Sequence, residues 1–339
     1  MGTREFPVPV CPCAPGPRIN ITIHMPLPQL SDIQRAHARI LPYVHRTPVM
    51  TSSGINRLLG AEFYFKCENF QKVGAFKYRG ATNAVLSLPK EELAHGVGTH
   101  SSGNHAAALA LAARIAGAPA YIVMPRTAPE IKKVAVAGYG GIITFCEPTQ
   151  EARESTMNRI QIETGCTFIH PYNRFEIIAG QGTAALEFLE EVPGLDIIMA
   201  PVGGGGLLSG TAIAARSVKP DITIWGGEPQ NADDARKSFY SGEIHPSIHP
   251  QTIADGLLTS LGTLTFSAIR KNVDDILLCP EPTIREAQRL IIERMKILIE
   301  PSSAVPLGAL MARPDKEWKG KKIGIILSGG NVQLSLSDK

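Results

Sequence analysis

The sequence predicts an α/β fold with two domains, each built around a parallel sheet. Short hydrophobic runs that are typical of buried strands alternate with longer helical patterns along the chain: FYFKCE, AYIVMP, IITFCE, DIIMAPV, ITIWGGE and KIGIILS. The chain has 339 residues, of which 44% are hydrophobic. Because domains contain about 150 residues on average, a chain of this length and composition is expected to bury two cores.

Composition and charge exclude several classes of protein. The net charge of +3 arises from interspersed basic and acidic residues, so no nucleic-acid partner is expected. No apolar run approaches the roughly 18 residues of a membrane helix, and no secretory leader is recognisable, so we expect a cytoplasmic protein without a membrane partner. The six cysteines are scattered, which favours reduced thiols. Residues 1–28 are rich in proline and are expected to form a flexible extension.

Lys77 is the first candidate catalytic residue. It lies in the segment FQKVGAFKYRG, between a loop that contains glycine and a helical pattern. A lysine attacks an aldehyde when burial or neighbouring cations lower its pKa. Phe70 and Phe76 offer apolar surfaces for this purpose, while Lys72 and Arg79 add positive charge. The segment therefore favours imine chemistry, and the alternative is a solvated lysine at the start of a basic helix.

A second segment, THSSGNHAAALALAARIAG, predicts a strand end, a polar loop and an alanine-rich helix that begins near Asn104. Unpaired backbone N–H groups at the N-terminus of a helix bind anions. Ser101, Ser102 and Asn104 add side-chain donors at the same place, so we expect a loop that binds a carboxylate. The alternative is an ordinary N-cap, because serine and asparagine are common there.

The third segment, DIIMAPVGGGGLLSG, predicts a strand, a glycine loop and a helix. Glycines 203–206 let the backbone approach an anion closely, so this loop is expected to bind a phosphate group. A Walker loop is excluded, because no lysine followed by serine or threonine comes after the last glycine. A nicotinamide-dependent dehydrogenase remains an alternative, because Glu228 closes the next strand pattern where a ribose-binding acid would lie. That alternative leaves Lys77 and the SSGNH loop without roles.

Three acidic residues lie close together in the segment GEPQNADD: Glu228, Asp233 and Asp234. Carboxylate and carbonyl oxygens suit hard cations such as Mg²⁺ or Ca²⁺, so a metal site is one interpretation. The other is a solvated loop followed by the start of a helix, where acidic residues are favoured.

Together, these segments resemble those of the fold-type II pyridoxal-phosphate enzymes, and within them the serine racemases and the related serine and threonine dehydratases. The resemblance runs from about Leu30 to Asn331 and includes the motif LSGGN. It implies that Lys77 binds pyridoxal 5'-phosphate covalently, with Phe76 beside the ring. The other cofactor contacts that it implies are Asn104, Gly203, Gly204, Gly205, Gly206, Leu207 and Ser328. The substrate contacts that it implies are Ser101, Ser102, Asn104, His105 and Arg153.

The activity that the resemblance implies is racemisation of serine, accompanied by β-elimination of serine to pyruvate and ammonia. The cofactor stabilises a carbanion at Cα, Lys77 removes the α-proton on one face, and Ser102 acts on the opposite face. Many biosynthetic threonine dehydratases have alanine at the position of Ser102. The alternative within the same chemistry is a dehydratase of serine, threonine or 3-hydroxyaspartate with little racemase activity. Arg153 is implied to reach the substrate side chain; otherwise it is a surface arginine on an amphipathic helix.

The resemblance also implies a domain layout and further ligands. A large cofactor-binding domain is expected from residues 29–95 and 174–339, a small mobile domain from residues 96–173, and the cofactor in the cleft between them. A divalent cation, Mg²⁺, Ca²⁺ or Mn²⁺, is expected to bind Glu228, the carbonyl of Ala232 and Asp234. A homodimer that acts on a small amino acid is expected as well.

ATP is a further candidate ligand, because animal serine racemases bind it at a dimer interface. The matching positions in this chain are Ser52, Ser53, Lys72, Tyr139, Lys296 and Asn331. Gly54, Val73 and Ala107 stand where the animal members have isoleucine, threonine and glutamine. With fewer polar contacts at these positions, we expect ATP binding to be weaker or absent.

Overall fold

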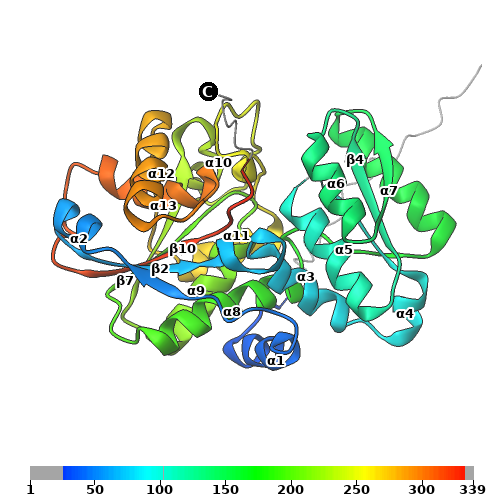
Figure 1. Ribbon diagram of the computed structural model, residues 1–339, viewed down its shortest axis with the longest axis horizontal. Helices are drawn as coiled ribbons and strands as arrows, with labels where there is room; N and C mark the ends of the chain where they lie inside the picture. The colour runs from blue at the N-terminus through cyan, green and yellow to red at the C-terminus, as the bar shows by residue number, and fades with distance from the viewer. Residues whose placement is uncertain (1–25, 102, 333–339) are drawn as a thin grey trace, which may run out of the picture.

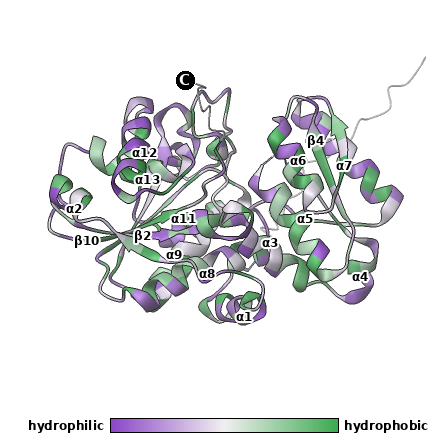
Figure 2. Cartoon of the chain, viewed as in Figure 1, coloured by the Kyte–Doolittle hydropathy of each residue, from purple (hydrophilic) through white to green (hydrophobic). Residues whose placement is uncertain are grey.

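The computed structural model describes residues 26–101 and 103–332, which form two lobes, each built around one sheet (Figure 1). The extension predicted for residues 1–28 lies outside the described residues as far as residue 25. In Figure 2, hydrophobic residues run through the strands and the central helices, and hydrophilic residues lie mainly on the outer turns. Within the described ranges, no helix is both long and apolar enough to cross a membrane.

The larger lobe contains a six-stranded sheet in the order β1-β2-β10-β7-β8-β9. Its strands are β1 (Val49–Thr51), β2 (Glu62–Cys67), β7 (Ile197–Pro201), β8 (Thr223–Pro229), β9 (Asp275–Cys279) and β10 (Lys322–Leu327). β1 runs antiparallel to β2, and all the other pairs are parallel. Ile325 of β10 pairs with Phe65 on one side and Met199 on the other. The last strand in sequence therefore lies inside the sheet, so segments from both ends of the chain build this lobe.

Helices cover both faces of this sheet, because successive side chains of its strands point to opposite sides. Ile198 and Ala200 of β7 pack in a core with α1 (Leu30–Ile40), α8 (Phe175–Glu191), α9 (Gly206–Val218), α10 (Asp234–Ser241) and α11 (Thr263–Asn272). Ile197 and Met199 pack on the other side with α2 (Ser53–Leu59), α12 (Glu281–Met295) and α13 (Pro301–Ala312). Short 3-10 turns lie at η1 (Glu68–Phe70), η2 (Lys72–Gly74), η3 (Gln230–Ala232) and η4 (Asp255–Leu257).

The smaller lobe contains a four-stranded parallel sheet in the order β5-β4-β3-β6. Its strands are β3 (Val97–His100), β4 (Ala120–Pro125), β5 (Gly141–Cys146) and β6 (Thr167–Phe168), and its helices are α4 (Lys90–His95), α5 (Asn104–Ala116), α6 (Glu130–Gly138) and α7 (Gln150–Thr164). The alanine-rich α5 packs against α3 (Lys77–Leu86), so one core joins the two lobes. The predicted α/β class is confirmed, and all six predicted strand patterns coincide with strands.

A buried cluster of four charged side chains holds the start of α3. The Arg79 guanidinium donates to both oxygens of Glu68, each at 2.8 Å, and to both oxygens of Glu187, at 2.7 and 2.8 Å. Lys66 donates to Glu187 at 2.8 Å, and all four side chains are inaccessible to solvent. Two cations thus face two anions, which satisfies the requirement that buried charges be paired. Because α3 begins at Lys77, this cluster also fixes the backbone that carries Lys77.

Candidate active site

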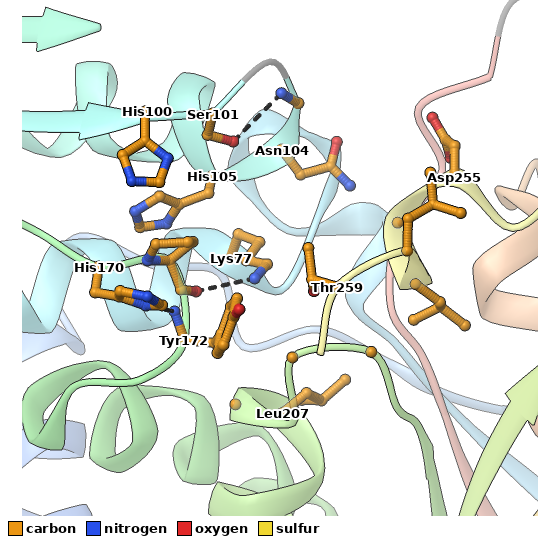
Figure 3. Close-up of a pocket in the computed structure, with 18 of the residues that line it drawn as sticks. Lys77, His100, Ser101, Asn104, His105, His170, Tyr172, Leu207, Asp255 and Thr259 are labelled. Carbon is orange, nitrogen blue, oxygen red and sulfur yellow. Dashed lines mark hydrogen bonds between the residues drawn. The ribbon is translucent and has the colours of Figure 1, made fainter. Parts of the chain in front are cut away.

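A cavity of about 590 Å³ lies between the two lobes, and Figure 3 shows part of its lining. The smaller lobe contributes the loop before α5 and the exposed side of α7, and the larger lobe contributes the start of α3 and the glycine loop. The predicted site residues that line it are Phe76, Lys77, Ser101, Asn104, His105, Arg153, Gly203, Gly204, Gly205, Gly206, Leu207 and Ser328. Ser102 lies outside the described residues, so its role stays a prediction.

Lys77 presents its amine to this cavity. Its Nζ donates a 3.0 Å hydrogen bond to the carbonyl of Pro171 and lies 5.2 Å from the centre of the Phe76 ring. Burial lowers the pKa of Lys77 to about 8, and the carboxyl of Glu300 opposes this shift. An amine with such a pKa is neutral in roughly a tenth of the molecules at pH 7. The amine is therefore available as a nucleophile near neutral pH.

Burial, one of the two expected causes, lowers this pKa, but three residues expected to contribute do not. Phe70 is 45% exposed and does not line the cavity. The positive charge of Arg79 is neutralised by two buried acids, and neither Arg79 nor Lys72 contributes to the lowered pKa of Lys77. Those expected contributions are wrong, because the fold turns Arg79 away into the ion cluster. Burial alone lowers the pKa.

The glycine loop connects β7 to α9 and leaves no room for side chains. Gly205 has φ +86°, and a Cβ there would come within 2.8 Å of Leu261 Cδ2. A Cβ on Gly203 would lie 2.8 Å from the backbone Cα of Leu257. Gly205 is the N-cap of α9 and has no side chain with which to cap it. The N–H groups of the first turn are therefore free to bind a phosphate, which also matches the positive end of the helix.

The loop before α5 forms the opposite wall. Asn104 is the first residue of α5, and its N-cap, Gly103, has no side chain. The Ser101 hydroxyl accepts from the Gly103 N–H at 3.5 Å. The ring of His105 is buried against the carbonyl of Ile169, at 3.2 Å, and burial lowers its pKa to about 3. His105 can thus contribute its backbone N–H rather than a charged ring to an anion at this helix end.

His170 is a neutral cavity residue with a defined proton position. The backbone N–H groups of Tyr172 and Asn173 donate to its Nδ1 at 3.3 and 3.0 Å. Burial lowers the pKa of His170 to about 4. Since Nδ1 accepts two hydrogen bonds, the single proton is on Nε2. The sequence offers a weak signal for this residue, which follows a short strand in the segment FIHPYN.

Ser328 and Glu300 complete the end of the cavity near the C-terminal strand. Ser328 Oγ lies 3.0 Å from Ser303 Oγ and donates to Glu300 Oε1 at 3.5 Å. Asn104 Nδ2 donates to both oxygens of Glu300, at 3.0 and 3.3 Å. Glu300 was not predicted from the sequence. Its only local signal is an acid inside the otherwise apolar run ILIEPSSA.

The acidic segment lies away from the cavity lining. Glu228 closes β8 and accepts from the backbone N–H groups of Ala235 and Arg236 at 2.7 and 2.8 Å. Burial raises the pKa of Glu228 to about 9 and that of Asp234 to about 6. These two buried acids lie beside η3, a turn that offers backbone carbonyl oxygens. Oxygen ligands of this kind suit a hard cation. Among the described residues, no three His, Cys, Asp or Glu side chains gather to hold a metal.

The six candidate ATP residues are distributed over several elements. Ser52 caps α2 and Ser53 begins it, Lys72 lies in η2, Tyr139 follows α6 and Lys296 follows α12. Only Asn331 of these six lines the cavity, where its Nδ2 donates to Asn104 Oδ1 at 2.9 Å. Within one chain these positions do not form a single pocket with the site of Lys77.

The geometry defines a class of enzyme. A half-buried amine lies between an uncapped glycine loop and a second uncapped helix N-terminus, an arrangement that suits a phosphorylated aldehyde and an amino acid. Glu228 does not line the cavity that contains the glycine loop, so it cannot contact a ribose bound there, and the dehydrogenase alternative loses its main support.

Comparison with known proteins agrees with this class. Residues 40–329 match the family model described as "Pyridoxal-phosphate dependent enzyme". The chain belongs to this family, and pyridoxal phosphate is its cofactor. The uncapped glycine loop and the amine of Lys77 fit the phosphate and the aldehyde of that cofactor.

The similar proteins include racemases and a dehydratase. A serine racemase of Dictyostelium discoideum is 52% identical over 313 residues, which cover 91% of this chain and 97% of the relative. The beta-hydroxyaspartate dehydratase of Paracoccus denitrificans (strain Pd 1222) is 48% identical over 310 residues, covering 91% and 98%. The structure of maize serine racemase superposes with a TM-score of 0.89 at 47% identity, covering 90% of this chain and 94% of that chain. The predicted family and fold type are confirmed.

Proposed function

We propose that this chain is a serine racemase that also eliminates water from serine to give pyruvate and ammonia. The observation that carries the proposal is the place of Lys77, whose amine faces a cavity between the glycine loop of one lobe and the N-terminus of α5 in the other. The racemase relative at 52% identity supports the choice of substrate.

Each wall of the cavity has a proposed task. The glycine loop and α9 hold the cofactor phosphate, Asn104 and Ser328 contact the ring, and Phe76 lies beside it. When bound, pyridoxal phosphate withdraws electrons from Cα of the amino acid, so that the α-proton becomes acidic. Lys77, with a pKa of about 8, accepts that proton near neutral pH. The N–H groups at the start of α5 hold the substrate carboxylate.

Ser102 is the proposed acid or base on the second face of the substrate. Replacement of Ser102 by alanine is expected to suppress formation of D-serine from L-serine while some production of pyruvate remains. Chiral product analysis together with a pyruvate assay measures both outcomes. Unchanged formation of D-serine in this variant contradicts the assignment of Ser102.

A second candidate function is dehydration of 3-hydroxyaspartate. Arg153 lines the cavity, and its buried Nε has no hydrogen-bond partner among the described residues. A guanidinium left unpaired in this way favours a second carboxylate on the substrate, and the Paracoccus relative has this activity in its name. Comparison of kcat/KM for L-serine, L-threonine and 3-hydroxyaspartate separates the two functions. Arg153→Leu should impair only the hydroxyaspartate reaction.

Further ligands and the assembly belong to the same proposal. A divalent cation is proposed at Glu228, the Ala232 carbonyl and Asp234, because two buried acids with raised pKa values lie there without an ion-pair partner in the described residues. ATP is proposed to bind weakly or not at all, and the chain to form a homodimer. Cys67, Cys146, Cys166 and Cys279 are free and buried, which supports a reducing compartment such as the cytoplasm.

The lobes are proposed to act as two domains that close over the substrate. The small mobile domain would comprise residues 96–173. The ion pair of Lys132 with Asp255, 2.8 Å long, joins α6 to η4 at the cavity. Closure of this kind excludes water from the reacting groups.

A further inference from the structure

Glu300 is a buried carboxylate in the wall of the cavity that none of the steps proposed above uses. Its side chain is 5% exposed, and it immediately precedes α13. Asn104 Nδ2 donates to its two oxygens, and Ser328 Oγ donates to one of them. Glu300 therefore contacts both polar residues that are proposed to bind the cofactor ring, one from each lobe.

The hydrogen bonds leave only one orientation for the Asn104 amide. Its Nδ2 faces the Glu300 carboxylate, and its Oδ1 accepts from Asn331 Nδ2 at 2.9 Å. Asn331 in turn donates to the carbonyl of Val73 at 2.8 Å, so it is held as a donor. A flipped Asn104 amide would place its oxygen against a carboxylate and its nitrogen against another nitrogen. The Glu300 and Asn331 contacts thus fix Asn104.

Close packing fixes Glu300 itself. The backbone N–H of Glu300 donates to the carbonyl of Gly329 at 3.0 Å. A Cβ on Gly329 would lie 2.8 Å from Glu300 Oε1 and 3.0 Å from Oε2. The carboxylate therefore occupies space that any side chain at position 329 would need. The carboxylate is thus packed against Gly329, beside Ser328.

We propose that Glu300 is a positioning residue that orients the Asn104 amide and the Ser328 hydroxyl toward the cofactor ring, and that protonation of its carboxyl changes the hydrogen bonds that the ring receives. The inference rests on the proposed ring contacts of Asn104 and Ser328. An ionised Glu300 accepts from both residues. A protonated Glu300 donates through one oxygen, so Ser328 must then accept, which frees its own proton for another acceptor.

Three charged groups face Glu300 from the surrounding elements: Lys77 of α3, Lys132 of α6 and Asp255 of η4. Lys132 and Asp255 form an ion pair with each other, and Lys77 is engaged by the cofactor in the proposed enzyme. Burial raises the pKa of Glu300 to about 7. The charge of Glu300 therefore changes near neutral pH.

The test follows the absorption and fluorescence of the cofactor in the holoenzyme between about pH 5.5 and 8.5, a window around this pKa. The wild type should show one spectral transition near pH 7. The amide in Glu300→Gln imitates a neutral carboxyl, so this variant should show the low-pH spectrum of the wild type throughout. Glu300→Asp should retain a transition with a shifted midpoint. Glu293→Gln, which alters a solvent-exposed acid on α12, is the matched control and should behave as the wild type.

Two results overturn the inference: no transition in the wild type, or an unaltered transition in Glu300→Gln. The first result is measured on the wild type alone, so the inference can be contradicted even if Glu300→Gln fails to fold. Asn104→Ala tests whether Glu300 affects the cofactor through Asn104. If it does, the amplitude of the spectral transition should fall at least about twofold in this variant. An unchanged amplitude contradicts this role of Asn104. Wild-type protein that binds no pyridoxal phosphate would instead contradict the proposed function.

Discussion

Lys77 and Arg79 lie two residues apart at the start of α3, yet their side chains enter opposite environments. Arg79 donates to two buried carboxylates, whose charges and hydrogen bonds outweigh its burial and raise its pKa. Among the described residues, Lys77 donates only to a carbonyl oxygen, and burial lowers its pKa to about 8. Arg79 is inaccessible to solvent, whereas Lys77 is half-buried at the cavity. Arg79 also has two acidic hydrogen-bond partners, and Lys77 has none among the described residues.

This contrast shows how one helix turn serves two purposes. A buried charge with partners gives a fixed geometry, and removal of one partner is costly because the others remain uncompensated. A buried amine without an acidic partner is easily deprotonated and therefore reactive. The ion cluster of Arg79 holds the backbone in place, which allows Lys77 to be left unpaired without losing its position.

The largest effect is expected from removal of the unpaired cation. Lys77→Ala should lower kcat/KM by at least about 10³-fold, because the nucleophile and base are lost together. With both proteins free of cofactor, its melting temperature should not fall, since the lost charge has no acidic hydrogen-bond partner among the described residues. Activity assays and thermal unfolding of the purified variant measure both. Lys90→Ala, at an exposed position of α4, is the control. A large loss of stability in Lys77→Ala would contradict the proposed difference between Lys77 and Arg79.

Removal of the paired cation should have the reverse effect. Arg79→Met leaves Glu187 with Lys66 and leaves Glu68 with only the hydroxyl of Thr47, so the free energy of unfolding should fall by about 3–5 kcal/mol. Urea denaturation measures this loss. The exposed Arg35 gives the comparison, because Arg35→Met should change stability by less than about 0.5 kcal/mol. Equal stabilities of the two variants would show that the buried cluster does not hold α3.

A smaller effect is expected in the phosphate loop. Gly203→Ala places a Cβ 2.8 Å from the Cα of Leu257, so the loop must shift and the affinity for pyridoxal phosphate should fall about 10-fold or more. A fluorescence titration of the cofactor-free protein gives this affinity. Gly138→Ala is the matched control, since a Cβ there meets no atom within 4 Å. If the two variants bind pyridoxal phosphate with equal affinity, the close packing of the glycine loop does not determine cofactor affinity.

Glu228 and Asp234, near the end of β8, are buried acids that can be compared with the buried cations. Burial raises the pKa of Glu228 to about 9 and of Asp234 to about 6. A raised pKa means that the neutral acid favours the folded state, so stability is highest at low pH and is lost as pH rises through these values. Without divalent cations the free energy of unfolding should fall by about 1–3 kcal/mol between pH 5 and 9.

A bound cation should counteract that loss, because it pairs with the ionised carboxylates. Chemical denaturation at several pH values, with and without Mg²⁺, measures the effect. Glu228→Gln should flatten most of the pH dependence and abolish the response to Mg²⁺. If Mg²⁺ does not change the stability of the wild type at any pH, the proposed metal site is contradicted.

Short-range patterns carried most of the correct predictions. Three segments each join a strand or loop to a helix: the glycine loop, the SSGNH loop and the segment of Lys77. Local patterns of this kind can be recognised in the sequence. Their meeting in one cavity follows from the parallel sheets, because the loops at the carboxyl ends of parallel strands lie at one edge. The resemblance to a family added the roles of single residues.

The residues that the sequence did not reveal depend on contacts between distant segments. Lys66 is a charged residue inside a strand pattern, and nothing local indicates that it faces Glu187. Glu300 interrupts an apolar run, but only the fold brings it to Asn104. The expected contribution of Arg79 to the low pKa of Lys77 was wrong for the same reason, since the partners of Arg79 come from η1 and α8.

We propose that the amine of Lys77 holds the cofactor covalently. Reduction of the holoenzyme with borohydride, followed by digestion and mass spectrometry, tests it directly. The account predicts a phosphopyridoxyl group on the peptide that contains Lys77 and on no other. A label on a different lysine such as Lys66 or Lys72, or no label on a protein that contains the cofactor, would contradict it.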